Sequence, residues 1–128
     1  MTKNTSPKEE YEARVFAEWL ELMKMQGKVV KFAHIANESY GGTRSDMLRG
    51  AKLKLMGKRP GVWDYEIYVP ALKCEDSLLC IKIELKRQKG GKLSPEQKEW
   101  EDVYHRAGHI TAVCNGADEA IAFVEKCF

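Results

Sequence analysis

The sequence predicts an α/β fold in which helices flank a small central mixed sheet. Two stretches, 61–69 and 78–86, alternate apolar and polar residues as strands do. The residues between them include Pro, Glu, Asp and Ser, which is typical of the loop of a hairpin. Apolar residues at helical spacing lie before and after this hairpin. The predicted order is helix, strand, helix, strand, strand, helix, strand, helix, which favours helices packed around a sheet.

The first helix is expected to begin at Ser6-Pro7, because proline is favoured at the first helical position, and to end at Gly27. Its inward side is predicted from helical spacing: Glu12, Val15, Phe16, Trp19, Leu22 and Met23. Residues 29–35 are apolar and β-branched enough for a strand. Residues 37–43 form a turn-rich loop, which separates this strand from the next helix.

A basic helix is predicted over residues 44–56, and Gly57 ends it. After the hairpin, Ser94-Pro95-Glu96-Gln97 is a strong helix start, with Ser94 as the cap and Gln97 at the position that a capping box requires. This helix is expected to reach Ala107. A strand over 109–114 and a last helix complete the fold. The inward residues of this helix are expected to be Ala120, Ile121, Phe123 and Val124.

The composition predicts one soluble domain over residues 1–128. Apolar residues make up 44% of the chain and charged residues 31%, which suits a domain with a real core. No apolar run approaches the ~20 residues of a membrane span, and the first residues lack the apolar core of a signal peptide. We therefore expect a cytoplasmic protein with no membrane partner. The four cysteines have no C-x₂-C spacing, which argues against a zinc site.

The charge is unevenly distributed along the chain. Residues 44–59 carry six basic side chains and one acidic one, and residues 82–92 carry five and one. Residues 93–128 have seven acidic side chains against three basic ones. Two basic segments favour a polyanionic partner such as a nucleic-acid backbone, although a basic segment can also be an ordinary solvated surface. The expected DNA contacts are Asn37, Arg44, Lys52, Lys54, Arg87 and Lys89.

Two acids are predicted to face each other across the hairpin. If the loop between residues 70 and 78 is symmetric, Asp64 lies opposite Glu84, with both side chains on one side of the sheet. Like charges in this position are destabilising, and a divalent cation between the carboxylates would relieve the repulsion. Lys86 lies on the same side because strand side chains alternate. Two acids, a lysine and a cation form a site suited to phosphodiester cleavage.

These motifs resemble the PD-(D/E)XK nuclease superfamily, and in detail its virus-type replication-repair nuclease (VRR-NUC) domain. The resemblance covers nearly the whole chain. It depends on the spacing Gly57-x-x-x-Gly61-x-x-Asp64, then Glu84-Leu85-Lys86, then a glycine turn and Ser94-Pro95-Glu96-Gln97 before Trp100. The family usually has proline where this chain has Trp63, for which we expect a packing role.

The resemblance implies a restriction-endonuclease-like core and a set of site residues. Asp64 and Glu84 would bind Mg²⁺ or Mn²⁺ with the backbone carbonyl of Leu85, and Lys86 would position water and stabilise the phosphorane. Gln97 matches a glutamine of the family, although the capping box alone explains it. The family also places a glutamate on the first helix, for which Glu9 and Glu12 remain equal candidates. His34, at the edge of a strand, is a weaker candidate for a role near the site.

The function implied is a metal-dependent endodeoxyribonuclease that acts as a homodimer on branched DNA, such as four-way (Holliday) junctions, with a role in DNA repair. The family name suggests a bacterial or phage-infected cell. The alternatives are a nuclease for flaps or single-stranded DNA, and a catalytically inactive nucleic-acid-binding module. A phosphohydrolase for small nucleotides is a weaker alternative, because the chain has no Gly-rich phosphate loop.

Overall fold

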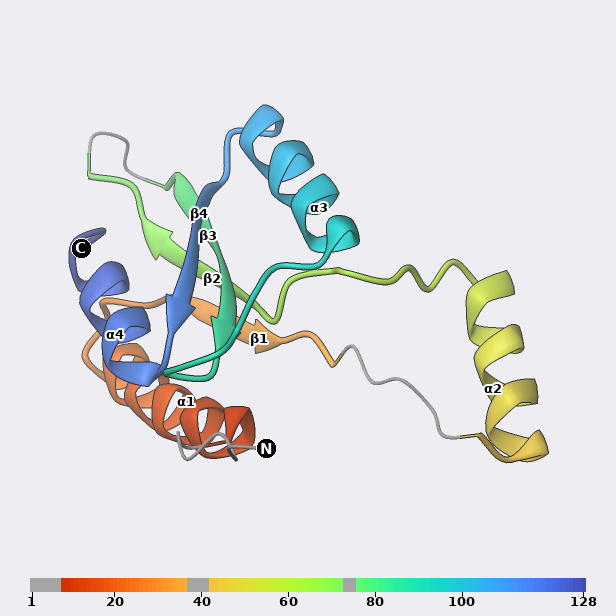
Figure 1. Ribbon diagram of the computed structural model, residues 1–128. Helices are drawn as coiled ribbons and strands as arrows, with labels where there is room; N and C mark the ends of the chain where they lie inside the picture. Colours follow the sequence, from red (N-terminus) through yellow and green to blue (C-terminus); the bar gives the residue numbers. More distant parts are fainter. Residues whose placement is uncertain (1–7, 37–41, 73–75) are drawn as a thin grey trace.

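The computed structural model describes residues 8–36, 42–72 and 76–128, which form a four-stranded mixed sheet with helices on both faces (Figure 1). The strands are ordered β1 (Lys31–His34), β2 (Tyr65–Pro70), β3 (Leu78–Lys86) and β4 (Ile110–Asn115). The β1–β2 and β2–β3 pairs are antiparallel, and the β3–β4 pair is parallel. The predicted order of elements and the small mixed sheet are therefore confirmed.

Two helices, α1 (Glu9–Met25) and α4 (Ala117–Glu125), cover one face of the sheet, and α3 (Pro95–Arg106) covers the other. The main core lies beneath α1 and α4. It consists largely of apolar side chains from the alternating positions of the hairpin and from one stripe of α1: Phe16, Leu20, Tyr65, Ile67, Val69, Ile81, Ile83 and Leu85. The alternate positions of β3, which include Lys82 and Glu84, face α3. None of the described helices is long and apolar enough to span a membrane.

The hairpin has the predicted register. Tyr65 pairs with Ile83 and Glu66 with Lys82, and the Lys82 Nζ lies 3.1 Å from the Glu66 Oε2. Asp64 comes one residue before β2, so the same register aligns it with Glu84. This alignment brings the two acids of the candidate site together.

The inward stripe of α1 differs from the prediction. Its buried residues are Glu12, Phe16, Leu20 and Met23, whereas Leu22 is exposed. Because α1 contacts both α4 and β3, its buried stripe is rotated around the helix relative to the predicted face, toward Leu20 and away from Leu22. The expected start at Ser6-Pro7 lies outside the described residues.

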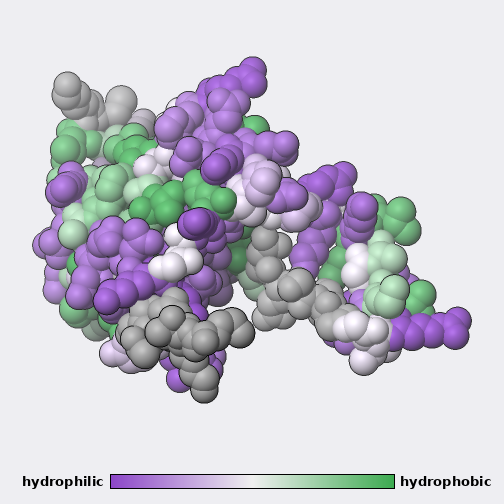
Figure 2. Space-filling view, in the orientation of Figure 1, coloured by the Kyte–Doolittle hydropathy of each residue, from purple (hydrophilic) through white to green (hydrophobic). Residues whose placement is uncertain are grey.

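The basic helix α2 (Arg44–Leu55) projects away from the sheet and buries none of its residues (Figure 1). It follows an N-cap at Thr43, whose hydroxyl accepts the Asp46 N–H, and it ends before Gly57 as predicted. Figure 2 shows apolar and hydrophilic side chains next to each other on this projection. The helix therefore lacks the packing that stabilises most helices in globular proteins.

Candidate active site

The carboxylates of Asp64 and Glu84 are held by reciprocal bonds to the backbone. The Asp64 N–H donates to Glu84 Oε2 at 3.1 Å, and the Leu85 N–H donates to Asp64 Oδ2 at 2.9 Å. Each acid is thus fixed by the strand that carries the other. The structure brings Asp64, Glu84 and Leu85 together, as the sequence predicted.

Burial raises the pKa of both acids. For Glu84, which is only 3% exposed, the neighbouring Asp64 carboxylate raises it further, to about 8. The nearby Lys86 ammonium opposes this rise without cancelling it. A buried and a half-buried carboxylate that repel each other are a donor set suited to a hard divalent cation, which would allow both to ionise.

Lys86 and Gln97 complete this polar cluster. The Lys86 Nζ lies 3.4 Å from Glu84 Oε1 and donates to Gln97 Oε1 at 3.0 Å. The Gln97 Nε2 donates to Glu84 Oε1 at 2.6 Å. Gln97 therefore holds both the acid and the lysine. Lys86 carries the positive charge nearest to the two acids, where it is able to stabilise an anionic group.

Gln97 also forms the predicted capping box of α3. Its N–H donates to the Ser94 Oγ, and its Oε1 accepts the Ser94 N–H at 2.9 Å. The same side chain therefore caps α3 and bonds both Glu84 and Lys86. The start of α3 is thereby tied directly to the acid and the lysine of β3.

The segment before Asp64 is anchored to α3. Trp63 is buried, its Nε1 donates to the Gln97 carbonyl oxygen at 3.0 Å, and its ring packs edge-on against Tyr104. The expected packing role is confirmed. Gly61 has φ of +82°, and a Cβ there would lie 2.6 Å from Glu96, so this close approach requires glycine. The approach sets the path of the chain into Asp64.

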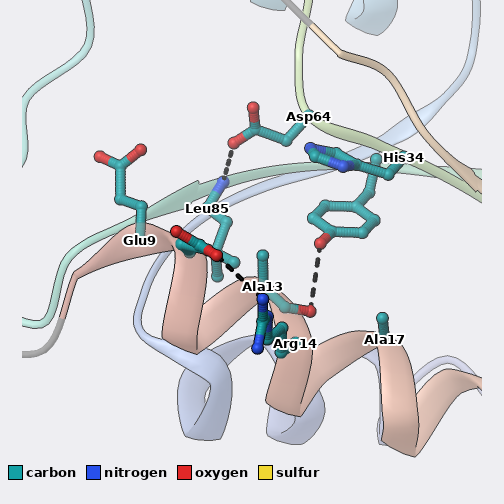
Figure 3. A pocket seen from close by; sticks show the side chains of 9 residues that line it. Glu9, Ala13, Arg14, Ala17, His34, Asp64 and Leu85 are labelled. Carbon is teal, nitrogen blue, oxygen red and sulfur yellow. Dashed lines mark hydrogen bonds and ion pairs between the residues drawn. The ribbon is translucent and has the colours of Figure 1, made fainter.

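The two glutamates of α1 occupy different surroundings. Glu12 is buried, and its Oε2 accepts the Ala117 N–H at 2.8 Å while its Oε1 accepts the Gln88 side-chain amide at 2.7 Å. It therefore caps α4. Glu9 is exposed and lines a pocket of about 410 Å³ with Asp64 and Leu85 (Figure 3). Of the two candidates, Glu9 is the one that shares a pocket with Asp64.

His34 and Tyr65 line the same pocket. Their rings stack with centroids 4.8 Å apart, and the Tyr65 Oη donates to the Ala13 carbonyl oxygen. Burial raises the pKa of Tyr65 to about 12, with a further contribution from Asp64, so Tyr65 stays a neutral hydrogen-bond donor. The alternation of the strand indicated a core role for Tyr65 and gave no sign of its place at the site.

The predicted DNA contacts are not gathered around the acids. Arg44, Lys52 and Lys54 lie on α2, away from the hairpin. Arg87 and Lys89 directly follow Lys86, so they are close to the acids along the chain. Asn37 lies outside the described residues. Within the described ranges, no three His, Cys, Asp or Glu side chains gather as a metal-binding cluster.

Removing Glu12 is predicted to destabilise the fold. Glu12→Ala should lower the free energy of unfolding by about 2 kcal/mol, because it leaves the buried Ala117 N–H without its carboxylate. Glu9→Ala, the matched control on the same helix, should change it by less than about 0.5 kcal/mol, because Glu9 is exposed. Urea denaturation followed by circular dichroism measures both changes. Equal effects would contradict the capping role.

The raised pKa of Glu84 predicts an unusual dependence of stability on pH. The metal-free chain should lose stability as pH rises from about 4.5 to about 8, because the folded state favours the protonated acid over this range. Glu84→Gln should lack most of this loss and keep only the smaller part due to Asp64, whereas Glu66→Gln, on the same strand pair, should retain all of it. Thermal unfolding in EDTA between pH 5 and pH 9 tests this. If Glu84→Gln gives the same pH profile as the unmodified chain, the raised pKa is wrong.

Comparison with known proteins bears on the fold. No protein-family model matches the sequence, and no curated protein matches it. A solved structure described as a VRR_NUC domain protein is similar, with a TM-score of 0.69 and 19% sequence identity. The similarity covers 99% of this chain and 91% of that one. The chain therefore has the α/β fold of a VRR_NUC domain protein, as the resemblance implied.

Proposed function

We propose that this chain is a metal-dependent nuclease of the VRR-NUC family. The observation that carries the proposal is the pair of the buried Glu84 and the half-buried Asp64, with Lys86 held against it by Gln97. Two acids together next to one lysine destabilise a fold, so stability alone does not explain this arrangement. The shared fold with a VRR_NUC domain protein supports the same conclusion.

The residues fit a divalent cation such as Mg²⁺ or Mn²⁺. Asp64 and Glu84 would supply carboxylate oxygens and Leu85 its backbone carbonyl oxygen, with water at the other positions. When bound, the cation would activate water and neutralise charge at the phosphorus. Lys86 would stabilise the anionic phosphorane, and Gln97 would keep the lysine oriented. Glu9 is the α1 acid that we include in the site.

The proposed substrate is DNA, with branched DNA such as a four-way junction preferred. Exposed basic side chains after β3 and on α2 favour a long polyanion over a small nucleotide. The alternatives remain cleavage of flaps or single strands, and binding without cleavage. Paired cuts across a junction need two sites, which a homodimer provides.

The proposed dimer surface is α2. Its apolar stripe follows one side of the helix: Met47, Leu48, Ala51 and Leu55. Leu48 is 56% exposed and Leu55 is 89% exposed, and a 12-residue helix is marginal in water without packing. An antiparallel pair of α2 helices from two copies would place Met47 of each opposite Leu55 of the other, with small Gly50 and Ala51 at the centre. The stripe is therefore self-complementary.

Cleavage of a labelled four-way junction tests the proposed activity. Paired, Mg²⁺- or Mn²⁺-dependent cuts are expected, with none in EDTA or in Asp64→Asn. Lys86→Ala should lower the cleavage rate on the order of a hundredfold, because it removes charge stabilisation at the phosphorane. Glu66→Gln, a matched change outside the acid pair, should keep the full rate.

The same assay includes a linear duplex, a flap and a single strand. Cutting of these alone would keep the nuclease and discard the preference for junctions. Binding of DNA without any cleavage would favour the inactive module. Unchanged cleavage by Lys86→Ala would contradict the proposed mechanism even if the protein cuts DNA.

Charge on the stripe of α2 should abolish the dimer. Leu48→Glu combined with Leu55→Glu is expected to give a monomer in sedimentation equilibrium, because the pairing would bury charged carboxylates in an apolar contact. Met25→Glu is the matched control, since Met25 is 84% exposed at the far end of α1. A monomeric unmodified chain, or a double variant that remains dimeric, would contradict this surface.

A further inference from the structure

The pocket that contains Asp64 extends beyond the residues that the proposed reaction uses. It lies between α1 and the strands β1 and β2, and its floor is largely apolar (Figure 3). The residues that line it are Glu9, Glu10, Ala13, Arg14, Ala17, His34, Asp64, Tyr65 and Leu85. The reaction accounts for only three of these, Glu9, Asp64 and Leu85. The whole pocket is called the groove below, and it contains one of the proposed metal ligands, Asp64.

Two features make this groove open and rigid. On the α1 side, Ala13 and Ala17 are one helical turn apart, and their small side chains leave the space free. On the sheet side, Tyr65 is buried, with its Oη bonded to Ala13 and its ring edge-on to Phe16 at 5.0 Å. The floor is therefore held in place before anything binds.

His34 presents a ring at the edge of the groove. It stacks on Tyr65 with an interplanar angle of 19°, and it is exposed to solvent. A planar ring supported in this way is a stacking surface for a nucleobase, whatever the base identity. A volume of about 410 Å³ is in the range of small-ligand sites and is sufficient for one nucleotide. Arg14 also lines the groove, and its guanidinium is paired with the Glu10 carboxylate at 3.1 Å.

We propose that this groove binds the sugar and base of one unstacked nucleotide next to the scissile phosphate, with the base stacked against His34. The inference rests on the proposed nuclease function and adds a specificity site to it. Because Asp64 belongs to both the groove and the acid pair, a nucleotide in the groove would place its adjoining phosphate at the acids. Unstacking costs least where a strand is already unpaired. The groove therefore favours DNA with a branch or an open end over a continuous duplex.

A cycle of binding measurements tests the groove. The ligand is a fluorescent four-way junction, with a stable abasic nucleotide scanned across the branch point. Affinity is measured by anisotropy in EDTA, where no cleavage occurs. At one position, base removal should weaken binding by the unmodified chain about tenfold. Ala17→Leu, which fills the groove, should weaken binding of intact DNA similarly and should show no further loss with the abasic DNA.

Three further variants isolate the cause. Ala122→Leu adds the same bulk at an exposed position of α4 and should keep the full sensitivity to base removal. His34→Ala should lose that sensitivity, and His34→Phe should restore it, because stacking needs a ring and not an imidazole. Circular dichroism confirms that each variant is folded.

The outcomes separate this inference from the nuclease proposal. The groove does not bind a base if no abasic position weakens binding, or if Ala17→Leu and base removal weaken binding independently. Neither result would contradict metal-dependent cleavage. If the unmodified chain neither binds DNA in EDTA nor cuts it with Mg²⁺ or Mn²⁺, both proposals are wrong. If His34→Phe restores the sensitivity to base removal, the result supports stacking. If His34→Phe does not restore it, stacking is overturned.

Discussion

The repulsion between Asp64 and Glu84 is the constraint on which the rest of the site depends. Two carboxylates in contact would normally move apart or stay protonated, yet here each is tied to the backbone of the opposite strand. These bonds hold the pair in place and oppose the rise in pKa that burial causes in both acids and that the Asp64 charge adds to at Glu84. The antiparallel register of β2 and β3 is what makes the two bonds possible, because it brings the start of one strand to the end of the other.

The support for this pair comes from α3 more than from the main core. Gln97 bonds Glu84 and Lys86, and its own backbone carbonyl accepts the Trp63 indole N–H. Ser94 in turn fixes Gln97 through the capping box. The start of this helix therefore orients the acid, the lysine and the chain that leads to Asp64. Local helix capping and the geometry of the site are maintained by the same bonds.

The parts of the site that depend on local rules were predictable from the sequence. Alternation and a symmetric loop predict the register that aligns Asp64 with Glu84, and the spacing from Ser94 predicts the capping box. The choice between Glu9 and Glu12 was not predictable, because the group that Glu12 bonds belongs to Ala117 at the other end of the chain. That Tyr65 lines the groove was not predictable for a similar reason. The alternation of apolar and polar residues along β2 indicates only that Tyr65 is buried.

The projecting helix α2 bears on both the proposed substrate and the proposed dimer. In one copy, the basic side chains of α2 stand apart from the acid pair, so the two do not form a single continuous surface. A second copy that pairs through α2 would join two such molecules by their basic helices, with one acid pair on each side of the two-fold axis. This arrangement matches a substrate with two equivalent strands to cut. Under the proposed dimer, the apolar stripe that leaves α2 unsupported in the single chain would account for the symmetric, branched substrate that we propose.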